Sequence, residues 1–137
     1  MNHELLKKNI SNVKILPPVS RSELIKYYMS ADILFLHLNN IPAFQRVLPS
    51  KIFEYIALKK PIIAGLSGYS AKFLKSHASY AHIFHPGDFK EAVNGILNAD
   101  KVIISEEEVS NFLKTFARAA IMDKMSSQLI YIIESSR

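Results

Sequence analysis

The sequence contains no cysteine and no long apolar run. Without cysteine, there can be neither a disulfide framework nor a thiolate metal site. The longest apolar runs, such as residues 33–38, fall far short of the roughly 20 residues that span a bilayer. The N-terminus also lacks the basic and then apolar layout of a signal peptide. We therefore expect a cytoplasmic protein that can contact a membrane, such as the inner membrane face, from one side without crossing it.

The composition is that of an ordinary globular domain, with 137 residues, of which 49% are apolar and 21% charged. This length predicts a single domain over residues 1–137 with a real hydrophobic core. The net charge is +5, which favours anionic ligands. The 17 lysines and arginines are spread along the chain without a polybasic block, so we do not expect a nucleic-acid partner.

Apolar runs and helix-start signals alternate along most of the sequence. Short apolar runs predict strands at residues 13–16, 33–38, 61–65 and 80–84. Cap residues predict helices that begin near Ser20, Ser50, Ser70, Asp88 and Ser105, with Glu23 completing a capping box for the first. Asp123 is expected to divide the C-terminal helical region into two helices.

Alternation of strands and helices is typical of a three-layer, Rossmann-like α/β fold, in which helices cover both faces of a parallel sheet. Such folds bind ligands at the carboxyl ends of the strands. The loops expected at that end are residues 17–19, 38–49, 65–70 and 85–88.

The segment from Pro49 to Tyr55 has the strongest ligand-binding pattern. The Ser50 hydroxyl, the first N–H groups of the following helix and the Lys51 ammonium together suit an anion. Glu54 follows one turn later and could accept hydrogen bonds from the hydroxyls of a ribose. This combination predicts a nucleotide site. The alternative is structural: Ser50 only caps the helix, Lys51 is a solvated charge and Glu54 completes a capping box.

Three other residues at the expected strand ends have two interpretations each. Gly65 and Gly68 would let a diphosphate approach the backbone closely, or they form an ordinary turn. His37 faces the ligand cleft or is a buried, hydrogen-bonded histidine, which is the commoner case. The spacing of the other histidines does not suggest a metal site, so no metal cofactor is expected.

Longer stretches of the sequence resemble glycosyltransferase family 4, a family of retaining enzymes with the GT-B fold. The resemblance runs from Asn12 through Asp32 and on through Pro49 to Ala64, and with residues 84–88 and the helix after them it covers most of the chain. These stretches are similar to the C-terminal, donor-binding domain of the family, and residues 84–88 are similar to its closing part. Residues 44–51 also resemble a subgroup that transfers N-acetylated aminosugars in bacterial surface polysaccharide synthesis.

In that family, the donor helix carries the second of two glutamates separated by seven residues. The second glutamate contacts the ribose of the nucleotide and the first lies near the sugar. Glu54 matches the second glutamate, whereas the first position falls at Arg46. The resemblance therefore implies a ribose contact at Glu54 and a contact of Gln45 or Arg46 with the sugar or the diphosphate.

The family's donor domain begins two strand–helix units earlier, with a glycine-containing loop that holds the diphosphate, and it closes against a separate acceptor domain. This sequence contains neither part. We therefore expect the UDP-sugar-binding part of a glycosyltransferase, either as a fragment or with an acceptor domain on a partner chain. Whether the isolated chain is an enzyme stays open. The alternative is an inactive interaction module that pairs with a partner or a second copy through an exposed sheet edge.

Overall fold

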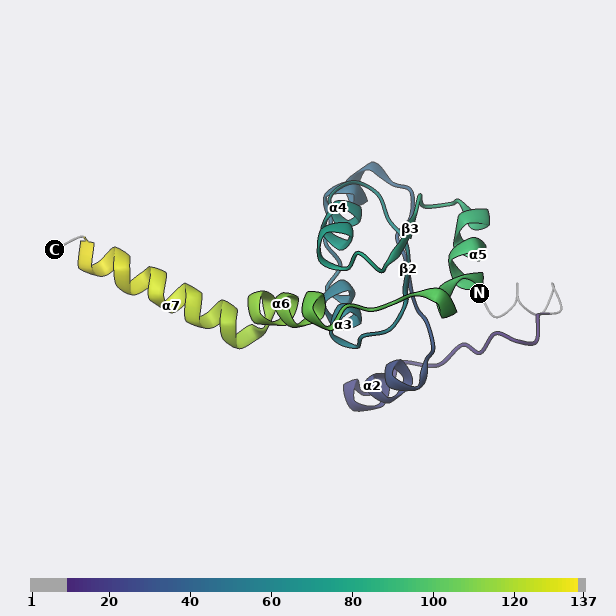
Figure 1. Ribbon diagram of the computed structural model, residues 1–137, viewed down its shortest axis with the longest axis horizontal. Helices are drawn as coiled ribbons and strands as arrows, with labels where there is room; N and C mark the ends of the chain where they lie inside the picture. Colours follow the sequence, from purple (N-terminus) through teal and green to yellow (C-terminus); the bar gives the residue numbers. More distant parts are fainter. Residues whose placement is uncertain (1–9, 136–137) are drawn as a thin grey trace. The chain divides into compact units, whose positions relative to one another are not determined.

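The computed structural model describes residues 10–135, and the chain divides into two compact units between Ala31 and Asp32 (Figure 1). In the first unit, helix α2 spans Arg21–Ser30. The predicted capping box is confirmed: the Glu23 N–H donates to Ser20 Oγ at 3.3 Å, and the Ser20 N–H donates to Glu23 Oε2 at 3.1 Å. The bonds from Ser20 stabilise the charged form of Glu23 and lower the pKa of its carboxyl group.

The strand expected at residues 13–16 is absent, and this segment has an irregular backbone instead. Val13 is 50% exposed and Leu16 is 37% exposed, so the apolar side chains that suggested a buried strand are in large part open to solvent. A strand needs a neighbour to pair its peptide groups. No strand within residues 10–135 pairs with this segment, so the prediction was wrong here.

The second unit contains a parallel sheet of three strands in the order β1-β2-β3. The strands are β1 (Leu34–His37), β2 (Ile62–Gly65) and β3 (His82–Phe84), and each lies within a predicted strand. The helices are η1 (Pro42–Arg46), α3 (Lys51–Ala57), α4 (Gly68–His77), α5 (Phe89–Leu97), η2 (Ala99–Lys101), α6 (Glu106–Phe116) and α7 (Arg118–Ser135). The unit is therefore a mixed α/β fold with an open parallel sheet.

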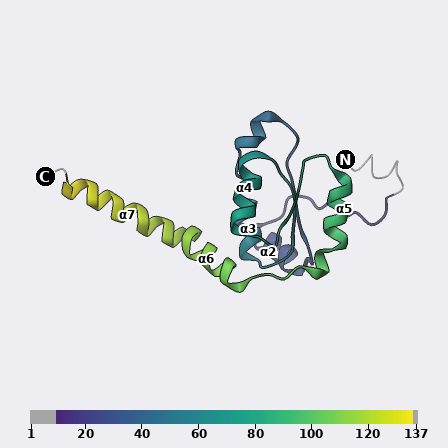
Figure 2. The ribbon, with the colours of Figure 1, turned by 45° about the horizontal axis from the view of Figure 1, so that its top comes forward.

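The two faces of the sheet differ in how well they are covered. Figure 2 shows the strands edge on, with α3 and α4 on one side and α5 on the other. Every residue of β2 is buried, as expected for a central strand of a parallel sheet. In β1, Leu34 and Leu36 are buried whereas Phe35 and His37 are exposed. Since α5 packs on β2 and β3, the same face of β1 lies partly open.

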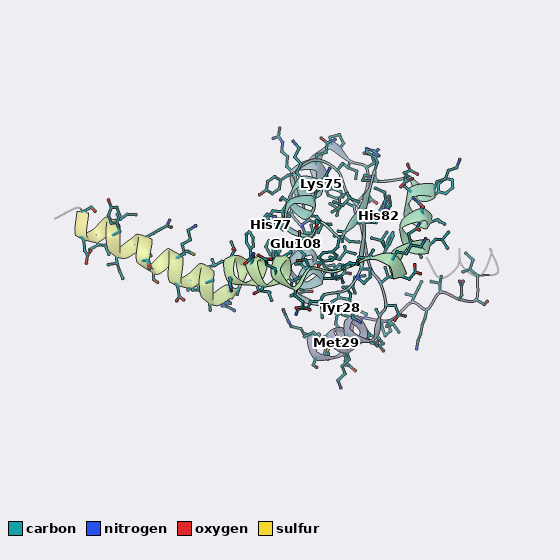
Figure 3. All side chains as sticks on the ribbon, in the orientation of Figure 1. Tyr28, Met29, Lys75, His77, His82 and Glu108 are labelled. Atoms are coloured by element: carbon teal, nitrogen blue, oxygen red, sulfur yellow. The ribbon has the colours of Figure 1, made fainter. Side chains whose placement is uncertain are left out.

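An aromatic cluster joins α3, α4 and α6 on the first side of the sheet. The Phe53 ring lies 5.5 Å from Phe73 and 5.7 Å from Phe112, between ring centroids. His77 stacks on Phe73 at 4.3 Å, and its Nδ1 lies 2.8 Å from the Phe73 carbonyl oxygen. Figure 3 labels His77 on α4 and Glu108 on α6, two residues at the contact between these helices. This cluster fixes α6 against the domain.

The C-terminal helical region divides at Ala117 and not at Asp123, as the sequence had suggested. Ala117 has an extended backbone with φ −60° and ψ 143°, whereas Asp123 lies inside α7. No side chain of α7 is buried. None of the helices within residues 10–135 combines the length and apolar character that crossing a membrane requires.

Candidate functional site

The carboxyl ends of the three strands lie side by side at one edge of the sheet. The parallel register pairs His37 with Gly65, and Gly65 with Phe84, so the last residues of the strands form one row. The loops that leave this row lead to η1 and α3, to α4, and to α5. In an open parallel sheet, this is the end at which ligands bind.

The first turn of α3 carries three of the predicted contact residues. Ser50 is the residue before the helix, and Lys51 begins it. Ser50 and Lys51 are exposed, and Glu54 is half-buried. The Ser50 hydroxyl makes no capping hydrogen bond, so the structural role that the sequence offered for this side chain is not confirmed. The first turn of α3 follows η1 directly in the chain, so Ser50, Lys51 and Glu54 continue the segment that leaves β1.

Arg46 ends η1, in the loop between β1 and α3, and its side chain is exposed. The η1 helix packs against α4. The contact is close at Gly68, which has a φ of +64° and faces the backbone of Gln45, so that any Cβ at this position would overlap the Gln45 carbonyl oxygen. The loops after β1 and β2 therefore converge, and they bring the Arg46 segment beside the start of α4.

Gly65 serves the packing of the strand ends. It is buried, and a Cβ at this position would lie 2.8 Å from Phe84 Cζ and still closer to the His37 ring. The two rings cover Gly65 from the α5 side, with centroids 6.0 Å apart. Neighbouring protein atoms leave no room for a Cβ at position 65 or 68, which explains the glycine at each. A contact of either glycine with a diphosphate stays a prediction.

His37 is exposed, so it is not the buried histidine that the sequence favoured. Its Nε2 accepts a hydrogen bond from the Gly87 N–H at 3.3 Å. This bond ties the end of β1 to the loop between β3 and α5. Sequence analysis missed the contact, because residues 50 positions apart in the chain share no periodic pattern. The position of His37 at the end of an apolar run was the only signal of its place in the site.

No family model, curated protein or solved structure matches this chain. Among residues 10–135, no three histidine, aspartate or glutamate side chains gather into a group that could ligate a metal ion. The chemical character of the site therefore rests on its own side chains.

Two cations and one carboxylate define what the site can bind. Arg46 ends η1 and Lys51 begins α3, so both carry positive charge on the segment that follows β1. Both side chains suit phosphate oxygens, which arginine can bind through two N–H groups. The Glu54 carboxylate can accept hydrogen bonds from hydroxyl groups. A ligand that carries both phosphates and a vicinal diol matches this set.

Proposed function

We propose that this chain is the nucleotide-sugar-binding part of a glycosyltransferase, and that UDP-sugars for bacterial surface polysaccharide synthesis are its ligands. The sheet would then be a truncated three-layer, Rossmann-like donor domain of the GT-B type. Arg46 and Lys51 bind the diphosphate, the Ser50 hydroxyl adds a donor, and Glu54 binds the ribose. Transfer of the sugar also needs an acceptor domain, which a partner chain would provide.

The observation that carries this proposal is the convergence of loops at the strand ends. Gln45 lies against Gly68, so the loop segment that carries Arg46 is packed against the start of α4. The same loop continues into Lys51 and Glu54 on α3. Charged residues held at this end of a parallel sheet suit a phosphate ligand.

Retaining transfer in a GT-B cleft depends on the alignment of donor and acceptor and on stabilisation of the diphosphate. The proposed site would therefore act by positioning the donor and by neutralising the charge of its diphosphate. A single domain therefore accounts for donor binding but not for turnover. We expect the isolated chain to bind UDP-sugars and to transfer no sugar alone.

The test is calorimetric titration of the whole chain with UDP and with UDP-N-acetylaminosugars. Saturable binding is expected, and Glu54→Ala should weaken it by about tenfold to a hundredfold, since a hydrogen bond to a charged group contributes about 1.5–3 kcal/mol. Glu107→Ala is the matched control, because Glu107 is an exposed carboxylate in the first turn of another helix, α6.

Binding that is unchanged in Glu54→Ala would remove the assigned ribose contact. Absence of binding at millimolar UDP and millimolar UDP-sugar would overturn the proposed function for this chain. Circular dichroism of each variant shows whether a loss of binding reflects a loss of fold.

A further inference from the structure

Helix α5 uses only part of its apolar surface to pack on the sheet. Gly95 is buried over β3, where a Cβ would lie 2.8 Å from His82 Cγ. In contrast, Phe89 and Leu97 are each 72% exposed and Val93 is 52% exposed. These three residues are spaced by four, so they form a line along one flank of the helix. In an amphipathic helix, such a line of apolar side chains is normally buried against another part of the protein.

The exposed flank of α5 borders two separate hollows, one over β1 and one beside the residues just before it. One hollow, of about 160 Å³, lies between Phe89 and the β1 side chains Phe35 and His37. Another, of about 550 Å³, lies between Leu97 and Ile33, just before β1. Phe35 is itself 48% exposed. We call this surface the α5–β1 groove and define it by Ile33, Phe35, His37, Phe89 and Leu97.

Helix α7 presents a convex apolar surface, whereas the α5–β1 groove is a concave one. With 3.6 residues per turn, one half of its surface is mostly apolar, and Arg118 and Ser126 are the polar residues within it. The large residues of this half are 40–59% exposed and are Ile121, Met122, Met125, Leu129, Ile130, Ile132 and Ile133. Figure 3 shows the α7 side chains with no other element of the second unit beside them. Asp123 and Glu134 lie along one border of this apolar half.

We propose that α7 of a second copy of this chain binds in the α5–β1 groove, and that the exchange is reciprocal in a two-fold dimer. An amphipathic helix in an apolar groove is a common mode of protein recognition. The 18 residues of α7 extend about 27 Å, which exceeds the length of the nine-residue α5. A two-fold dimer fills both α5–β1 grooves and covers both α7 helices.

Charge at the borders of the two surfaces supports this partner. Lys90 lies on α5 beside the exposed line, and the border of the apolar half of α7 carries the carboxylates of Asp123 and Glu134. The helix of the same copy is a poor occupant. Its start at Arg118 follows α6, which packs on α3 and α4, and these helices lie on the other side of the sheet from α5.

The groove contains none of the proposed nucleotide contacts, so this inference does not rest on the proposed function. Light scattering across micromolar to millimolar concentrations should show a mass of two chains. Leu97→Asp in the groove and Leu129→Asp on α7 should each weaken self-association by at least about tenfold, because each places a carboxylate in an apolar contact. Both positions are exposed in one copy, at 72% and 59%, so the fold of each variant should persist.

Asn94→Asp and Ser127→Asp are matched controls on the polar sides of the same two helices, and they should leave the dimer intact. A monomer in the wild type at millimolar concentration would overturn the proposal. So would a Leu97→Asp variant that stays dimeric while Leu129→Asp does not, because this result would mean that α7 pairs with itself. Dimers that persist in both variants would place the contact elsewhere, such as the edge of β1.

The absence of cysteine allows a direct second test. A copy with Leu97→Cys, mixed with a copy with Leu129→Cys, should form mixed disulfide dimers in preference to dimers of either variant alone. Preference for the Leu129→Cys pair alone would contradict the reciprocal contact.

Discussion

The two sides of the sheet differ in how far the fold covers their apolar residues. On the side of α3 and α4, Leu34 and Leu36 of β1 are 3% and 8% exposed. On the side of α5, Phe35 of the same strand is 48% exposed. The first side holds the core and the aromatic cluster, and the second has an uncovered groove. Stability should therefore depend mainly on the first side, and association on the second.

The largest expected effect is the loss of stability from a substitution on the covered side, compared with a substitution on the side of α5. Leu74 of α4 is fully buried, so Leu74→Ala should lower the free energy of unfolding by about 2–5 kcal/mol. Val93 of α5 is 52% exposed, and Val93→Ala should cost less than about 1 kcal/mol. Urea unfolding at a concentration at which the chain is monomeric measures both. Equal losses would break the distinction between the two sides.

The next effect tests the close packing around Gly65, at the strand ends on the α5 side. Gly65→Ala should lower the free energy of unfolding by about 1–3 kcal/mol, because the new methyl group overlaps the His37 and Phe84 rings. The double variant with His37→Ala should recover part of the loss, since His37 is exposed and its removal makes room. Additive losses in the double variant would contradict the close approach of His37 to Gly65.

A smaller effect concerns the attachment of α6 to the covered side. The Ser105 hydroxyl accepts a hydrogen bond from the Glu108 N–H at 3.2 Å and caps the helix. Ser105→Ala should therefore cost about 1 kcal/mol, measured by urea unfolding. Ser105→Asp, which can make the same bond, is the control and should retain most of the stability.

The smallest effect at neutral pH comes from Tyr80, whose buried hydroxyl has no hydrogen-bond partner among residues 10–135. Tyr80→Phe should change the free energy of unfolding by less than about 1 kcal/mol there, because no bond is lost. Burial, together with the Glu108 carboxylate, raises the pKa of Tyr80 to about 12.

Alkaline pH should enlarge this effect. Above about pH 10, Tyr80 ionises in the unfolded chain but stays neutral in the folded one. The wild type should therefore lose stability as the pH rises towards 12, and Tyr80→Phe should lose less. Urea midpoints between about pH 9 and 12 measure the difference, and parallel curves for the two proteins would contradict the buried state of this hydroxyl.

Local patterns predicted most elements of the domain, because its strands and helices have their signals within a few residues. The capping residues Asp88 and Ser105 both make the expected bonds. Patterns failed where a partner decides the structure: residues 13–16 look like a strand but have no neighbour to pair with. The break at Ala117 has no local signal at all, because alanine is the best helix former.

The candidate site was predictable in part. The start of α3 could be found from Ser50 and the residues that follow, because the signal is contiguous. The approach of Gln45 to Gly68 and the bond between His37 and Gly87 join segments far apart in the chain, and only the folded structure shows them. The sequence also did not reveal that α5 leaves an apolar flank uncovered, since its pattern is that of any amphipathic helix.

The most direct test of the central claim is a map of backbone amide chemical shifts during titration with UDP. The account predicts that the shifted amides cluster at residues 45–54 and 65–68, at the carboxyl end of the sheet, and that Glu54→Ala removes the response. A saturable response confined to other residues, or no response at millimolar UDP, would contradict it.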